Sequence, residues 1–92
     1  DRIGEGLIDM IRLSVSFYGE IADRLGRERA MVFAADDITV GEIRAELARQ
    51  DEAAAILLNP QIRAAVDSIV VEDDAGVKSG QDVVFFSIVS GG

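Results

Sequence analysis

The residues with the clearest potential for chemistry lie at the very end of the chain, which closes in Ser90-Gly91-Gly92. Because glycine has no Cβ, Gly91 and Gly92 can adopt backbone angles closed to other residues and can pass through a narrow channel. The unhindered terminal carbonyl is open to attack, although its carboxylate must first be converted to a better electrophile, for example by adenylation with ATP. Two interpretations are open at this point: a frayed terminus, which is common, or a reactive end.

The composition excludes most other chemistries. The 92 residues include no His and no Cys, which excludes imidazole catalysis, thiolate nucleophiles, disulfides and Cys/His zinc sites. The glycines have neither P-loop nor dinucleotide-binding spacing. The acidic pairs Asp36-Asp37 and Asp73-Asp74 flank turns, where Asp forms local hydrogen bonds, and we interpret both as structural. We therefore expect no metal site and no directly bound cofactor.

The charge balance indicates the kind of partner. Seventeen acidic residues against nine basic ones give a net charge of −8, the wrong sign for binding nucleic acid and more suited to a basic protein partner. No apolar run approaches the roughly 20 residues that a membrane span needs. Without a signal-peptide pattern, the default expectation is a cytoplasmic protein.

The first half of the chain predicts a strand, two helices and a second strand. Ile11 to Phe17 alternates apolar and polar residues, the period of a half-buried strand. Thr39 and Glu42 fit a capping box, which marks a helix start, and Val40, Ile43 and Leu47 continue it as one apolar stripe. The remaining expectations are a short helix over 20–25 capped by Gly26, a strand over 29–35, and a helix-favouring segment over 53–58 that ends before Pro60.

The second half predicts more strands and a fold. Residues 62–66 and 69–71 indicate strands around a tight Asp67-Ser68 turn, followed by a polar segment over 72–82. Residues 83–89 are apolar on both faces except at Ser87, which favours a central strand covered on both sides and placed next to the first strand. The order predicts an α+β protein, a mixed sheet packed on one main helix, in the β-grasp or ubiquitin-like fold.

The domain organisation follows from the same patterns. Residues 1–9 are weakly patterned, and Met10 opens the first strand, so 1–9 is interpreted as an N-terminal extension or an artificial remnant. Residues 10–89 are expected to form the β-grasp domain. Residues 90–92 would then be a flexible Ser-Gly-Gly tail.

Several short motifs together resemble the ubiquitin-like sulfur carriers, and among them the small subunit of molybdopterin synthase. The resemblance covers Met10 to Gly92, and its pieces are weak singly but fairly specific in their order, spacing and terminal position. They are Ile11–Phe17 with Tyr18-Gly19-Glu20-Ile21, Leu25-Gly26, Thr39-Val40, Leu47, Ala64-Ala65-Val66, Ser79-Gly80-Gln81-Asp82, Val84-Phe85-Phe86 and Val89-Ser90-Gly91-Gly92.

The resemblance implies a function centred on Gly92. A ubiquitin-activating-type adenylyltransferase would use ATP to adenylate the Gly92 carboxylate, and a sulfur source would convert it to a thiocarboxylate. The tail would then enter the large subunit of molybdopterin synthase, within a heterotetramer, and donate sulfur to cyclic pyranopterin monophosphate in molybdenum cofactor biosynthesis. Gly92 would be the catalytic residue of a sulfur-donating, otherwise non-catalytic subunit. The partner-binding residues would be Gly91, Ser90, Val89 and Phe86.

One departure from the family pattern leaves alternatives open. Ser87-Ile88 stands where the family often has two prolines, which would stiffen the tail and block strand pairing. The ending is also similar to that of the thiamine-pathway sulfur carrier, but the length and the 20–25 helix favour molybdopterin synthase. A ubiquitin-like protein modifier is a further alternative. Parity along the last strand does not decide which of Phe85 and Phe86 faces outward.

Overall fold

The computed structural model describes residues 10–87, and its centre is formed by the first and last strands of that range. β1 (Ile11–Phe17) and β7 (Asp82–Ser87) pair in parallel, and β4 (Ile62–Val66) pairs antiparallel with the other side of β7. β2 (Glu28–Phe33) and β5 (Ile69–Val71) form the two edges, which gives the order β2-β1-β7-β4-β5.

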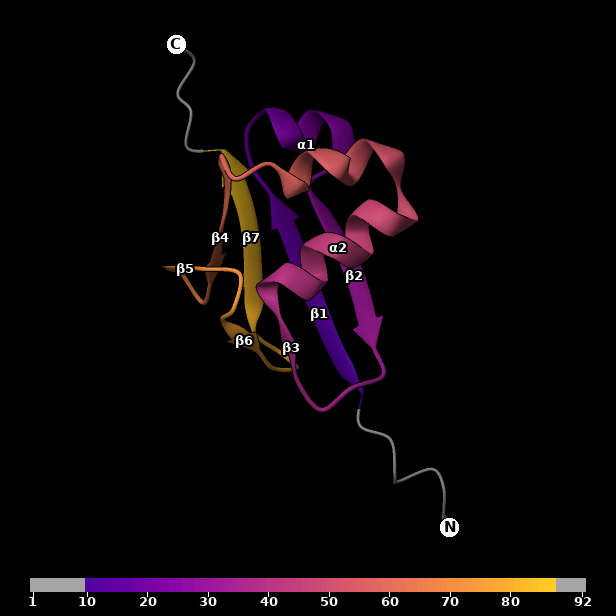
Figure 1. Cartoon of the computed structure of the whole chain (residues 1–92), viewed down its shortest axis with the longest axis vertical. Helices are drawn as coiled ribbons and strands as arrows, with labels where there is room; N and C mark the ends of the chain where they lie inside the picture. Colours follow the sequence, from indigo (N-terminus) through magenta and orange to yellow (C-terminus); the bar gives the residue numbers. More distant parts are fainter. Residues whose placement is uncertain (1–9, 88–92) are drawn as a thin grey trace.

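Three helical segments accompany this sheet. α1 (Glu20–Leu25) follows β1, α2 (Val40–Gln50) lies across one face of the sheet, and the 3₁₀ helix η2 (Glu52–Leu58) continues from α2 (Figure 1). A mixed sheet with one main helix on one face is the predicted β-grasp arrangement, which is confirmed.

The core forms where the sheet meets these helices. The odd-numbered residues of β1 are buried and the even-numbered ones are largely open to solvent, as the period of two predicts. The apolar stripe of α2 is wholly buried against them. The most deeply buried large side chains are Phe17, Phe85, Ile11, Ile21, Ile43, Leu47, Leu57, Val15, Val40, Val77 and Val83.

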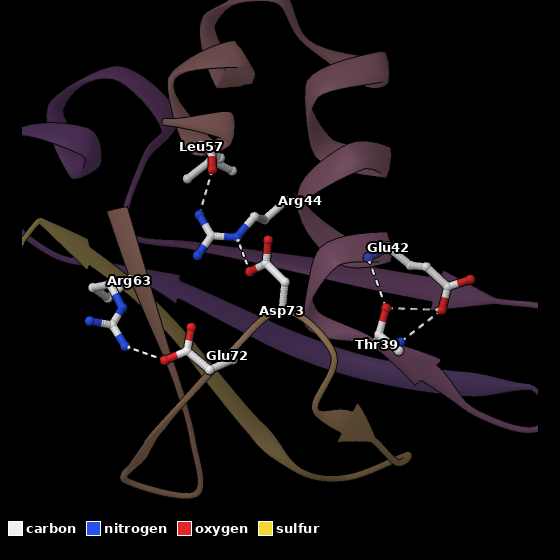
Figure 2. Close-up of polar contacts among 7 residues, drawn as sticks. All are labelled: Thr39, Glu42, Arg44, Leu57, Arg63, Glu72 and Asp73. Carbon is white, nitrogen blue, oxygen red and sulfur yellow. Dashed lines mark hydrogen bonds and ion pairs between the residues drawn. The ribbon is translucent and has the colours of Figure 1, made fainter. Parts of the chain in front are cut away.

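A capping box fixes the start of α2. The backbone N–H of Glu42 donates to Thr39 Oγ1 at 3.2 Å, and the backbone N–H of Thr39 donates to Glu42 Oε1 at 2.8 Å (Figure 2). Two amides at the start of the helix are thereby satisfied. Gly41 N–H donates to the Asp73 carbonyl at 2.9 Å and so ties the helix to the loop that follows β5. The predicted capping box is confirmed.

Two local expectations differ from the structure. The second strand spans Glu28–Phe33 rather than 29–35, because its pairing with β1 ends where Phe33 meets Ile11. The polar segment over 72–82 contains β6 (Gly76–Val77), which pairs with β3 (Ile38–Thr39) and buries Val77 completely. Two-residue strands are too short to show a period in the sequence.

The last strand is central, as predicted, but the expectation that both its faces are covered was wrong. Val83 and Phe85 are fully buried, whereas Val84 and Phe86 are half-buried. The reason is that α1, α2 and η2 supply the helical cover of the face on which Phe85 lies. The opposite face of the strand is therefore open at its apolar side chains.

Phe33 is half-buried at the end of an edge strand and packs against the core from outside. We predict that Phe33→Ala lowers the free energy of unfolding by clearly less than the roughly 3–5 kcal/mol typical of a buried Phe. Phe17→Ala, at a site that is 1% exposed, should show that full loss. Urea unfolding of both variants measures the difference, and equal losses would contradict this placement of Phe33.

Asp51 joins β2 to the start of η2. Its carboxylate accepts a hydrogen bond from Arg29 Nη2 at 2.7 Å and another from the backbone N–H of Ala53 at 2.9 Å. These bonds, that to Arg29 first, hold the pKa of Asp51 below its usual value. A carboxyl whose pKa is lower in the folded state stabilises that state above its unfolded pKa, and this contribution is lost as the pH falls through its folded pKa.

Asp51→Asn should therefore lower the melting temperature at neutral pH and reduce the loss of stability between neutral and strongly acidic pH. Melting curves of both proteins across that range measure the effect. Glu52→Gln, at an exposed neighbouring carboxyl, serves as the control and should leave the acid limb unchanged. Parallel pH profiles for Asp51→Asn and the parent protein would refute a role for this ion pair in acid stability.

Candidate functional site

The predicted reactive tail follows the end of β7 in the chain. Val89, Ser90, Gly91 and Gly92 lie outside the described residues, whereas Phe86 lies within them. The carboxyl end of β7 is at the same end of the sheet as α1 (Figure 1). It is held from both sides, because Ser87 pairs with Ile62 of β4 and the Tyr18 N–H donates to the Phe85 carbonyl at 3.0 Å.

Successive residues of a strand point to opposite faces, and this separates the two phenylalanines. Phe85 packs inward, with its ring stacked at 6.2 Å between centroids on that of Phe17. Phe86 is half-buried on the open face, two residues from Val84 on the same strand. The structure thus decides what the sequence left open: Phe86, the predicted partner-binding residue, faces away from the core.

Phe86 belongs to an apolar region of the open face, here called the sheet patch. The patch comprises Val84 and Phe86 of β7, Ala65 of β4 and Val70 of β5. Val84 pairs with Ala65 and Ala65 with Val70, so these three side chains form one row across neighbouring strands. Val70 is 53% exposed, Val84 and Phe86 are half-buried, and Ala65, at 8% exposure, is buried between its neighbours. An apolar row that ends at the last described strand is suited to contact with another protein.

An exposed aromatic residue, Tyr18, follows β1 and is bonded through its backbone to the end of β7. Tyr18 is 61% exposed. It also lines a shallow pocket of about 400 Å³ together with Phe17, Gly19, Ala22, Asp23 and Arg27. Tyr is among the residues that contribute most at protein interfaces. In the sequence Tyr18 is only one member of a motif, and no pattern there predicts a role for it.

A buried positive charge, that of Arg44, lies against the inner face of β7. Arg44, in the middle of α2, lies with its guanidinium carbon 5.2 Å from the centre of the Phe85 ring. Its Nε donates to Asp73 Oδ1 at 2.8 Å, and its Nη1 donates to the Leu57 carbonyl (Figure 2). Arg44 thus connects α2, η2 and the loop after β5 beneath β7. It follows Val40 by four residues on the buried stripe, a signal that could have identified it.

The described residues hold no metal-binding arrangement. No group of three or more His, Cys, Asp or Glu residues in 10–87 is placed to bind a metal ion. Within the same range, no helix has the length and apolar character to span a membrane. The described part of the candidate site is therefore a surface. It is the sheet patch, which includes residues of β7, the strand that precedes the tail in the chain.

Comparison with known proteins gives the family. The ThiS family model matches residues 15–92, from β1 to the last glycine. A comparison with curated protein sequences gave no significant match.

Solved structures show the same fold at low identity. A Pyrococcus furiosus protein assigned as molybdopterin converting factor subunit 1 is 16% identical. Its TM-score is 0.70 over 86% of this chain and 99% of that one. Two crystal structures of small archaeal modifier protein 1 of Haloferax volcanii are 17–18% identical, with a TM-score of 0.69 over 86–88% of this chain and 99% of that one. One chain of the Helicobacter pylori complex of molybdopterin-converting factor subunits 1 and 2 is 21% identical. Its TM-score is 0.58 over 91% of this chain and 100% of that one.

These likenesses confirm the β-grasp fold, and the family match rests on the sequence itself. The match covers far more than half of the chain and includes the terminal glycines. The chain belongs to the ThiS family, which confirms at the family level the resemblance to ubiquitin-like sulfur carriers.

Proposed function

We propose that this chain is the sulfur-carrying small subunit of a molybdopterin synthase and that Gly92 carries the sulfur. The observation that carries the proposal is the family match extending through Gly91 and Gly92. It fits a body without His or Cys, because the working group would be the terminal carboxyl and not a side chain.

The proposed chemistry takes three steps, of which the first two activate the Gly92 carboxyl group and load it with sulfur. In the first, a carboxylate oxygen of Gly92 attacks the α-phosphate of ATP on an activating adenylyltransferase and releases pyrophosphate. In the second, hydrosulfide, or a donor that delivers sulfur at the same oxidation level, displaces AMP from the acyl-adenylate and leaves a thiocarboxylate. In the large subunit the thiocarboxylate sulfur then bonds to cyclic pyranopterin monophosphate, and water cleaves the acyl carbon–sulfur bond, so that Gly92 is returned as a carboxylate. The carrier has to present only its end, and the enzymes supply the catalytic groups.

The length of the tail limits where such an enzyme can bind. Five residues, 88–92, follow the last described residue. Fully extended, they would span at most about 18 Å. An active site that receives Gly92 must then lie close to Ser87, so its protein must cover the end of β7. The sheet patch and Tyr18 are the apolar and aromatic surfaces available there.

The neighbouring structures support a large-subunit partner. The Helicobacter pylori structure is a complex of subunits 1 and 2 of molybdopterin-converting factor. We propose by analogy that a large subunit docks on the sheet patch of this chain, with Phe86 in the contact. A heterotetramer and a cytoplasmic location are part of the same proposal.

Two other members of the same functional group are the alternatives. A thiamine-pathway carrier would use the same tail chemistry with a different acceptor. A protein modifier is favoured by the likeness to small archaeal modifier protein 1, and it would instead join Gly92 to lysines of target proteins. The product formed from activated Gly92 distinguishes these candidates.

We predict that intact-mass analysis of the chain, coexpressed with its activating enzyme and a sulfur source, shows one oxygen replaced by sulfur. Deleting Gly92 should abolish this mass change and sulfur transfer, and should leave the melting temperature unchanged. Gly76→Ala, at a glycine without a positive φ and with open space around an added Cβ, is expected to keep the mass change. An unmodified carboxylate in the presence of active enzyme would count against the proposal, and lysine conjugates would favour the modifier.

Phe86→Ser should weaken binding to the large subunit at least tenfold, because an anchor in the proposed contact is lost. It should cost far less stability than Phe85→Ser, since Phe85 is fully buried. Isothermal titration with the purified large subunit and urea unfolding measure the two effects. Val32→Ser, at a 51% exposed apolar residue on the far edge strand, is the matched control. Equal affinities for Phe86→Ser and the parent protein would place the docking surface elsewhere.

A further inference from the structure

A charged residue lies within the proposed docking surface. Arg63 of β4 pairs directly with Phe86 across the β4–β7 ladder, so both side chains leave the sheet on the same face. The Arg63 side chain is 30% exposed. A partner that covers Phe86 therefore also covers Arg63.

Among residues 10–87, the carboxylate partner of Arg63 is Glu72, and the hydrogen bond between them uses only part of the guanidinium. Its Nη2 donates to Glu72 Oε2 at 3.0 Å (Figure 2). This hydrogen bond uses one of the five N–H donors of a guanidinium. Glu72 itself is 79% exposed, so it lies at the rim and contributes little as an ion-pair partner in water.

A pocket adjoins this ion pair. It has a volume of about 380 Å³ and is lined by Arg44, Arg63, Glu72 and Asp73, together with the apolar or amide side chains of Leu58, Asn59, Pro60 and Val71. Arg44 is the most buried of the four charged lining residues, with a side chain that is only 8% exposed. Figure 2 shows that each of the two guanidinium groups faces one carboxylate of the loop after β5. The wall thus carries two positive and two negative charges at close range.

Docking changes the energetics of Arg63. Burying a guanidinium is strongly unfavourable unless good hydrogen bonds replace the lost water. A largely exposed Glu72 that bonds one nitrogen does not satisfy the remaining donors. Arg is also the residue best suited to bind a planar carboxylate through two parallel bonds.

We propose that the partner inserts an aspartate or glutamate side chain into this pocket and pairs it with Arg63. The sheet patch then supplies the apolar contact and Arg63 sets the chemistry that the partner must present, a carboxylate next to an apolar surface. The inference rests on the proposed function for its partner, the synthase large subunit. It adds a specificity determinant that the tail cannot provide, because Gly-Gly carries no side-chain information.

Replacing Arg63 by Met tests this pairing, because Met keeps an apolar stem and removes the charge. Isothermal titration of the unmodified full chain with the purified large subunit, at several salt concentrations, is the measurement. Arg63→Met should weaken binding about tenfold or more and reduce its salt dependence. Arg12→Met, at an exposed arginine that pairs with Val32 near the other edge, is the matched control and should bind like the parent protein.

The variant Glu72→Gln separates the partner's carboxylate from the internal one. If the partner supplies the acceptor, Glu72→Gln should bind as well as the parent chain or better, and Arg63→Met/Glu72→Gln should be as weak as Arg63→Met. If Glu72 is the sufficient counter-charge, Glu72→Gln should weaken binding and the double variant should restore it. That second result would overturn the inference.

The remaining outcomes are also decisive. Arg63→Met binding as tightly as the parent chain, while Phe86→Ser binds weakly, would refute the carboxylate and leave the sheet patch and the proposed function in place. No binding by the parent chain itself would remove the proposed partner and the inference with it. Urea unfolding of each variant confirms that a weakened affinity does not reflect a loss of fold.

Discussion

The packing around Phe85 is the constraint on which the rest of the structure depends. Its ring lies against Phe17 on one side and under the guanidinium of Arg44 on another. This places β7 between β1 and β4 and brings α2 down onto the strand. Because the direction of one side chain fixes its neighbours along a strand, burying Phe85 also turns Phe86 outward. The core thus determines which face is offered to a partner.

The sequence predicted those parts of the fold that repeat a pattern over several residues. The alternation from Ile11 to Phe17 and the Thr39–Glu42 capping box are local signals, and both are present in the structure. The pairing of Val77 with Ile38 depends on two residues that are far apart in the chain, so no local pattern could show it. The last strand was apolar on both faces, and only the placement of the helices decides which face is covered.

The candidate site was predictable to a different extent. Gly91 and Gly92 could be chosen as site residues from the sequence alone, because their proposed role depends on residue type and on their position in the chain. Arg44 has a helical spacing that could have shown it to be inward-facing. Arg63 has no comparable signal, since its importance arises from Phe86 on the neighbouring strand and Glu72 beyond the next turn. Such a site depends on tertiary pairing, which a sequence pattern does not contain.

The parallel pairing of β1 with β7 has a mechanical consequence. A protein that takes hold of the last glycine and draws it into a channel applies a load along β7. That load acts lengthwise on the ladders to β1 and β4, so many backbone hydrogen bonds resist it together and none has to yield first. A final strand at the edge of the sheet would be held by one ladder and would resist the same load with fewer hydrogen bonds. Under the proposed function, the central position of β7 therefore lets the chain be drawn by its end without being unravelled.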